Sequence, residues 1–231
     1  MEFAIDFAGR RIHASCADKQ REYFCPVCRH KVIPRQGKVN IDHYAHTSPC
    51  DDTWSYDMSE WHKDWQSQFP YGNREIVVTV SEEKHRADVM AYGYVIEFQH
   101  SPITAEEFNE RNNFYLHSGK KVIWIFDFRK EFSSHRIKCY DEWKNSNDNG
   151  GKFNWKYPKR FLQDYIPQNR KDIIVFFQFE DAKHGDSEVF YIERITWAII
   201  EDGQSNFKRF CTSYYPGNVT ELLDYMKNKK L

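Results

Sequence analysis

The spacing of apolar residues changes near residue 53. The first fifty residues contain short apolar stretches broken by turn-forming residues, which is typical of short strands. Between residues 53 and 69, Trp61 and Trp65 fall on one helix face, and Ser59 can cap the start of that helix. The pattern therefore predicts a small strand-rich segment followed by an amphipathic helix.

Three short runs of β-type residues follow the helix, at 75–80, 86–90 and 94–99. Polar or glycine-containing pieces of turn type separate the runs. Because the separating pieces are short, the runs are expected to form a β-meander.

A second helix is predicted for residues 104–117. Thr104 and Glu107 form a capping box at its start, and Gly119 can end it. The next run, 121–127, is continuously apolar, as in a strand buried on both faces. Strand, helix and buried strand together predict a right-handed crossover between two parallel strands.

The rest of the chain indicates a further β-rich part. Residues 145–151 are rich in Asn, Ser, Asp and Gly, which is typical of a loop or a domain boundary. Residues 172–180 and 188–200 alternate like paired strands, and 219–227 is expected to form a closing helix. The fold class predicted from these patterns is α/β, with a mixed sheet.

Composition narrows the functional classes. Aromatic residues make up 17% of the 231 residues, so the chain can build an apolar core. It has no apolar run of about 18 residues and no signal-peptide pattern at its start. We therefore expect a soluble, cytoplasmic protein with no membrane partner. The net charge of −1 does not by itself indicate a polyanionic partner.

Basic residues nevertheless gather early in the chain. They either follow a nucleic-acid backbone or form an ordinary solvated face. The residues are Arg10, Arg11, Lys19, Arg21, Arg29, Lys31, Arg35 and Lys38.

Cysteine and histidine residues in the first fifty positions predict a structural zinc site. Cys25 and Cys28 form a Cys-x-x-Cys turn, and His46 follows after a hairpin-sized gap. A redox role for the two cysteines would require a thioredoxin-like context, which the pattern lacks. The fourth ligand is either His43 or Cys50. If residues 41–46 form an extended strand, the alternation of side chains places His43 and His46 on opposite faces of that strand.

Two acids mark a candidate catalytic site. On a strand, Glu97 and Gln99 project from one face while Ile96 and Phe98 enter the core on the other. Asp88, on the preceding strand, can approach Glu97. Two such carboxylates can hold Mg²⁺ or Mn²⁺, which would activate a water for phosphodiester hydrolysis. In the alternative interpretation, both acids are simply solvated on a one-sided sheet.

Six motifs occur in the order found in one protein family. They are Cys25-Pro-x-Cys28, His43-Tyr-Ala-His46, Ser59-Glu-x-His62, Arg86-Ala-Asp88-Val, Ile96-Glu97-Phe-Gln99-x-Ser101 and Val122-Ile-Trp124-Ile. In these motifs the chain resembles the CoiA-like competence protein family.

The resemblance implies an N-terminal zinc-ribbon-like module on a restriction-endonuclease-like core of the PD-(D/E)XK type, in a family tied to DNA uptake and recombination. The expected parts are a module at 1–52, a nuclease core at 53–144 and a C-terminal extension at 145–231.

The same resemblance assigns roles to particular residues. Asp88 matches the first acid of the superfamily and Glu97 the second. Glu60 and His62 lie on the helix that often supplies an extra ligand. Glu60 is a candidate metal ligand, and His62 either orients water or contacts a phosphate, or is a helix-surface histidine.

Gln99 departs from the superfamily pattern, because it occupies the position of the usual lysine. Glutamine can orient a water by hydrogen bonds but supplies no charge. Either a cation from elsewhere, such as Lys63, Arg86 or Lys120, compensates, or the enzyme is slow.

Three functions remain open at this point. The first is a metal-dependent nuclease acting on DNA, with the zinc module helping to hold the strand; cutting both strands would call for two active sites, as in a homodimer. The second is a non-catalytic nucleic-acid-binding protein that kept the fold. The third is an interaction protein that docks a recombination or defence partner.

Overall fold

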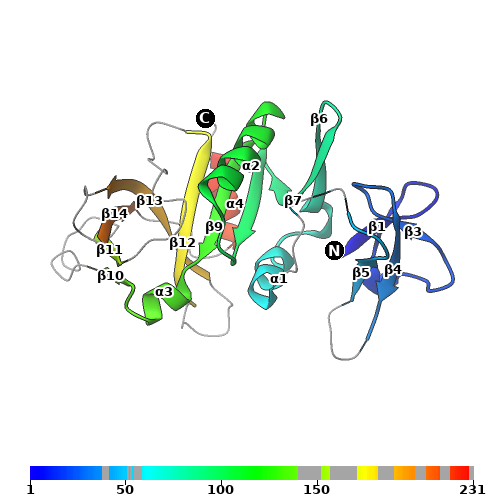
Figure 1. Ribbon diagram of the computed structural model, residues 1–231, viewed down its shortest axis with the longest axis horizontal. Coiled ribbons are helices and arrows are strands. Elements are labelled where there is room, and N and C mark those ends of the chain that lie inside the picture. Colours follow the sequence, from blue (N-terminus) through cyan, green and yellow to red (C-terminus); the bar gives the residue numbers. More distant parts are fainter. Residues whose placement is uncertain are drawn as a thin grey trace.

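The computed structural model describes residues 1–37, 42–50, 52, 54, 59–139, 152–156, 171–181, 190–200, 207–213 and 219–228. Within these residues the chain forms a five-stranded sheet and a nine-stranded sheet, with helices beside the larger one (Figure 1). The larger sheet contains both parallel and antiparallel pairs, which confirms the predicted mixed α/β class.

The N-terminal sheet is antiparallel and has the strand order β2-β1-β3-β4-β5. Its strands are β1 (Phe3–Ile5), β2 (Arg11–His13), β3 (Tyr23–Phe24), β4 (Lys31–Arg35) and β5 (His43–His46), with a 3₁₀ turn at Ala14–Cys16. Its small core includes Tyr23, Val32 and Tyr44. The predicted short strands are confirmed; Lys38 lies outside the described residues.

The predicted meander and crossover are also confirmed. A 3₁₀ turn at Tyr71–Asn73 leads into β6 (Arg74–Val80), β7 (Glu83–Ala91) and β8 (Tyr94–Gln99), which pair antiparallel. Helix α2 (Ala105–His117) then connects β8 to its parallel neighbour β9 (Lys121–Asp127). The cap forms as expected, because the Thr104 side chain accepts a hydrogen bond of 3.1 Å from the Glu107 amide.

The C-terminal strands continue the same sheet. The remaining elements are α1 (Glu60–Ser67), α3 (Arg129–Ser133), β10 (Ile137–Cys139), β11 (Lys152–Lys156), β12 (Ile173–Asp181), β13 (Phe190–Ile200), β14 (Phe207–Ser213) and α4 (Val219–Asn228). β12 pairs in parallel with β9, and the strand order is β10-β11-β14-β13-β12-β9-β8-β7-β6. The predicted loop 145–151 lies outside the described residues, and the three-part division of the chain stays a prediction.

Each face of the large sheet has its own apolar core. On one face, α2 packs over Trp124, Phe126 and Phe177; on the other, α1 and α4 pack over Ile125 and Phe176. Figure 1 shows α2 and α4 on these opposite faces. The three tryptophans at 61, 65 and 124 are buried and belong to the core. In the described part of the chain, no helix has the length and apolarity needed to cross a membrane.

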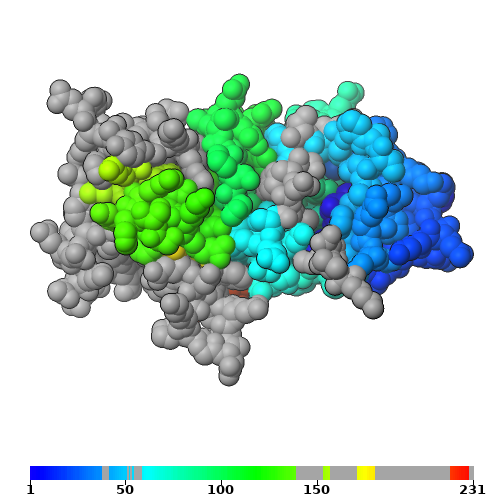
Figure 2. Space-filling view, turned by 60° about the horizontal axis from the view of Figure 1, so that its bottom comes forward, coloured from blue at the N-terminus to red at the C-terminus, as the bar shows by residue number. Residues whose placement is uncertain are grey.

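Buried polar contacts join the N-terminal sheet to the large sheet. The Glu75 carboxylate accepts hydrogen bonds from the amides of Glu2, at 2.9 Å, and Phe3, at 3.1 Å. Arg74 lies 3.5 Å from the Glu2 carboxylate. Glu75 has a φ of 47°, an uncommon backbone conformation for a side chain of this size, which these bonds help to hold. Figure 2 shows the blue N-terminal residues gathered at one end, beside the cyan residues of α1.

Candidate metal centre and candidate active site

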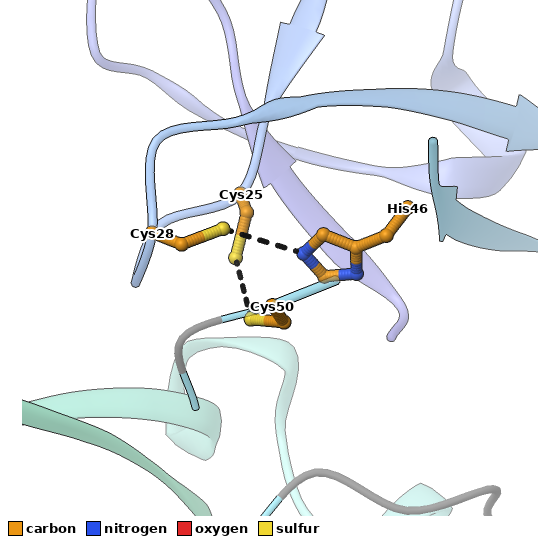
Figure 3. A group of neighbouring side chains, drawn as sticks. All are labelled: Cys25, Cys28, His46 and Cys50. Carbon is orange, nitrogen blue, oxygen red and sulfur yellow. Dashed lines mark hydrogen bonds between the residues drawn. The ribbon is translucent and has the colours of Figure 1, made fainter. Parts of the chain in front are cut away.

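Four side chains of the N-terminal part converge on one point (Figure 3). Cys25, Cys28, His46 and Cys50 place one ligand atom each within 4.8 Å of all the others. Cys25 and Cys28 come from the turn after β3, His46 ends β5, and Cys50 follows β5. The fold thus brings together three sulfur ligands and one nitrogen ligand.

The spacing of these atoms fits tetrahedral zinc. With Zn–S of about 2.3 Å and Zn–N of about 2.0 Å, ligand atoms lie about 3.5 to 3.8 Å apart around a tetrahedral ion. The Sγ atoms of Cys25 and Cys50 are 4.0 Å apart, and Cys28 Sγ lies 3.6 Å from His46 Nε2. Both distances are close to the tetrahedral values, so the cluster is compatible with a small ion.

The protonation state of the cluster depends on whether a cation is bound. Burial raises the pKa of the Cys25 thiol, and burial with its thiol neighbours raises the pKa of Cys50 to about 12. A bound divalent cation would reverse this preference by stabilising the thiolates. Burial lowers the pKa of His46, which keeps the imidazole neutral and able to ligate. The cluster can thus bind a metal such as zinc.

His43 is not a member of this cluster. Residues directly opposite in an antiparallel pair share a face. His46 lies opposite the buried Val32, whereas His43 lies opposite the exposed Arg35. The two histidines therefore project from opposite faces, and Cys50 completes the group in place of His43.

Asp88 and Glu97 meet where two strands of the large sheet separate. The β7–β8 pairing runs from Ala91 to the pair Val89–Ile96. Beyond that pair, the Asp88 carboxylate accepts a hydrogen bond of 2.9 Å from the Phe98 amide. The Asp88 amide in turn donates to the Glu97 carboxylate at 3.4 Å. The side chain of Asp88 thus replaces a backbone partner and is fixed beside Glu97.

Glu97 is almost fully buried and is held by α2. Its carboxylate accepts hydrogen bonds from Tyr115 Oη at 2.9 Å and from Arg111 Nη1 at 3.2 Å. Burial, and then the nearby negative charge of Asp88, raise the pKa of Glu97 to about 8 in spite of these contacts. The interpretation of Glu97 as a solvated surface acid is therefore wrong, because its exposed fraction is 2%.

The structure places the other three predicted residues, His62, Glu60 and Gln99, in different surroundings. His62 Nε2 lies 3.1 Å from Asp88 Oδ1, and His62 is buried, so it is not a helix-surface histidine. Glu60 is exposed on the first turn of α1. Gln99 is buried and donates a hydrogen bond of 2.8 Å from its side-chain amide to the Ser101 carbonyl.

Arg111 is the residue that sequence reasoning missed. Lys63, Arg86 and Lys120 are the cations that the sequence suggested in place of the usual lysine. The guanidinium bonded to Glu97 belongs instead to Arg111. The available signal was its place on the buried face of α2, where Arg111 falls among apolar residues at helical spacing. A cation on such a face generally has a buried acidic partner.

The fold and the two sites define a class of protein in which a Cys/His module precedes a mixed α/β sheet with paired acids. Family models identify it further. The N-terminal domain of competence protein CoiA matches residues 9–51, and the nuclease-like domain of competence protein CoiA matches residues 73–147. The chain therefore belongs to the CoiA-like competence protein family, and its central part is a nuclease-like domain. Neither the curated proteins nor the solved structures contain a significant match.

Proposed function

We propose that the protein is a metal-dependent nuclease that hydrolyses phosphodiester bonds in DNA, with Asp88 and Glu97 holding Mg²⁺ or Mn²⁺. The observation that carries this proposal is the contact between the half-buried Asp88 and the buried Glu97, two acids whose joint ionisation is unfavourable. A divalent cation would relieve that repulsion, and carboxylate oxygens are its preferred ligands. Asp88 Oδ2 accepts a hydrogen bond from the Phe98 amide and Glu97 Oε2 accepts one from Arg111, and each of these oxygens has a second lone pair that could face a metal.

The surrounding residues have separate proposed roles. A bound divalent ion would supply an activated water and would neutralise charge on the phosphate. Gln99 would orient that water, because the bond to Ser101 fixes its amide group. Arg111 and His62 are positioning residues that hold Glu97 and Asp88 respectively.

The order of elements supports a restriction-endonuclease-like core of the PD-(D/E)XK type. The two acids lie on consecutive strands of a meander, which a crossover helix links to a parallel strand. In the same proposal, the Cys/His cluster holds a structural zinc ion, and the basic residues of the N-terminal part contact the DNA backbone.

Cleavage of labelled single- and double-stranded DNA with Mg²⁺ or Mn²⁺ tests the proposal. Asp88→Ala should lower the rate by about two or more orders of magnitude, because it removes a metal ligand. Glu106→Gln, which changes an exposed acid on α2, is the matched control and should cleave like the wild type. Equal cleavage by Asp88→Ala and the wild type would contradict the assignment.

A second candidate is a nucleic-acid-binding or partner-docking protein with weakened catalysis. It is favoured by the absence of a lysine at position 99 and by the existing bond from Arg111 to Glu97. Binding of a divalent metal at Asp88 and Glu97 separates the two candidates, since only the nuclease requires it.

A further inference from the structure

Two described residues that follow the Cys/His cluster in sequence, Asp52 and Trp54, contact the strand of Asp88. Two residues after Cys50, the buried Asp52 carboxylate lies 3.1 Å from His85 Nδ1 and accepts a hydrogen bond of 3.3 Å from the Arg86 amide. Both partners are on β7, immediately before Asp88. Asp52 therefore connects the cluster to the strand that carries the first acid.

Trp54 makes a second connection, to the other acid. Its ring stacks on His85, with centroids 3.3 Å apart and an angle of 13° between the planes. Its carbonyl accepts a hydrogen bond of 3.4 Å from Arg111, whose guanidinium carbon lies 5.3 Å from the Trp54 ring centroid. Arg111 in turn holds Glu97. Trp54 therefore reaches the second acid through one intervening side chain.

The contacts of Asp52 and Trp54 depend on where the chain after Cys50 lies. Asp52, Trp54 and Arg111 are all buried, so a lost partner cannot be replaced freely by water. Asp52 is two residues from Cys50 and therefore lies within about 7 Å of it, so a large displacement of Cys50 would strain the contacts of Asp52. Cys50 is a member of the cluster, so Asp52 and Trp54 lie between the cluster and the contacts of both acids.

We propose that Asp52 and Trp54 are positioning residues through which the metal-bound Cys/His cluster orders Asp88 and the Arg111–Glu97 pair. Loss of the cluster metal would release Cys50, loosen the start of β7 and the Arg111 side chain, and weaken divalent-metal binding between the two acids. The last consequence rests on the proposed function, whereas the ordering of β7 and α2 does not.

Hydrogen exchange of the full chain tests the ordering itself. Cys50→Ser, compared with Cys16→Ser as an exposed control outside the cluster, should lose amide protection in peptides covering β7 and α2. Unchanged protection in those peptides, with zinc lost from Cys50→Ser, would overturn the proposal. This readout needs no activity and no second metal.

Trp54 variants test the route while leaving the cluster intact. Trp54→Ala should keep one zinc per chain but raise the Kd for Mn²⁺ about tenfold or more, as expected for groups that orient metal ligands. Trp54→Phe retains a ring over His85 and should recover most of the affinity. Trp155→Ala, which removes a buried tryptophan of the same core next to Phe128, should leave the Kd unchanged.

A double-mutant cycle tests whether Cys50 and Trp54 affect Mn²⁺ binding through the same contacts or independently. If the route is common, Cys50→Ser should weaken Mn²⁺ binding much less in the Trp54→Ala background than in the wild type. Additive effects would overturn the proposal. If Asp88→Ala binds Mn²⁺ as well as the wild type does, the proposed active site fails, and the exchange experiment still decides whether the cluster orders β7 and α2.

Discussion

At the residue scale, strand alternation decides which histidine belongs to the Cys/His cluster. We predict that Cys50→Ser lowers zinc well below one ion per chain and lowers the melting temperature, because it removes a thiolate ligand. His43→Ala should keep a full zinc ion, since His43 lies on the opposite face. Elemental analysis of protein purified without chelator measures both. Loss of zinc from His43→Ala with retention in Cys50→Ser would reverse the assignment.

The presence of Arg111 changes the expected effect of a lysine at position 99. Gln99 is buried, and Arg111 already places a cation at Glu97. Gln99→Lys would add a second buried positive charge, so we predict that the Kd for Mn²⁺ rises about tenfold or more. The additional change Arg111→Met should recover part of this loss. Tighter Mn²⁺ binding by Gln99→Lys alone would show that position 99 still favours lysine.

Residue patterns predicted the acids better than their partners. Alternation along β8 is a local property, so the common face of Glu97 and Gln99 and the burial of Phe98 could be inferred from sequence. Helical spacing indicates that Arg111 lies on the buried face of α2, but its pairing with Glu97 depends on how α2 is rotated against the sheet, which no local pattern predicts. The choice of Cys50 likewise depends on the path of the chain after β5.

At the element scale, an ion-paired aspartate ties the ends of two parallel strands. Asp127, at the end of β9, lies 2.8 Å from His100 Nδ1, just beyond β8, and accepts hydrogen bonds of 2.9 Å from Arg129. Burial raises the pKa of Asp127, but the bonds from Arg129 and His100 outweigh it, and the pKa falls below its usual value. This carboxylate therefore stabilises the fold in its ionised form.

The sign of the pH dependence follows from that lowered pKa. Stability from Asp127 is present above the unfolded pKa of about 3.9 and is lost as pH falls through the lower folded pKa. We predict that Asp127→Asn lowers the free energy of unfolding by about 2 kcal/mol at pH 7 and that the difference from the wild type shrinks in acid. Denaturant titrations between pH 3 and 7 measure it. Asp172→Asn, a more exposed acid, is the control. A constant difference at every pH would contradict the role given to the charge.

Elements with local signals were predicted most reliably. The Thr104 cap, the positive φ of Gly119 at 74° and the apolar run of β9 are all sequence-local, and the β8–α2–β9 unit follows from them. The pairing of β12 with β9 joins residues about fifty positions apart and has no such signal. It arises because both strands are apolar on both faces.

At the scale of the whole molecule, the nine-stranded sheet extends beyond the predicted nuclease core. Phe177 on β12 packs 4.2 Å from Phe128, and Gln178 accepts hydrogen bonds of 2.7 and 2.8 Å from Trp61 and Trp65. We predict that a chain ending at residue 144 loses cooperative thermal unfolding and self-associates, because the β9 edge and two apolar faces become exposed. Calorimetry and sedimentation measure both properties. A monomeric fragment with a sharp melting transition would support a separate C-terminal part.

Calorimetric titration of the zinc-loaded protein with Mn²⁺ measures directly whether Asp88 and Glu97 together hold a divalent ion. We predict one Mn²⁺ site per chain in the wild type and in Glu106→Gln, and loss of that site in both Asp88→Asn and Glu97→Gln. Undiminished Mn²⁺ binding in the two active-site variants would contradict that prediction.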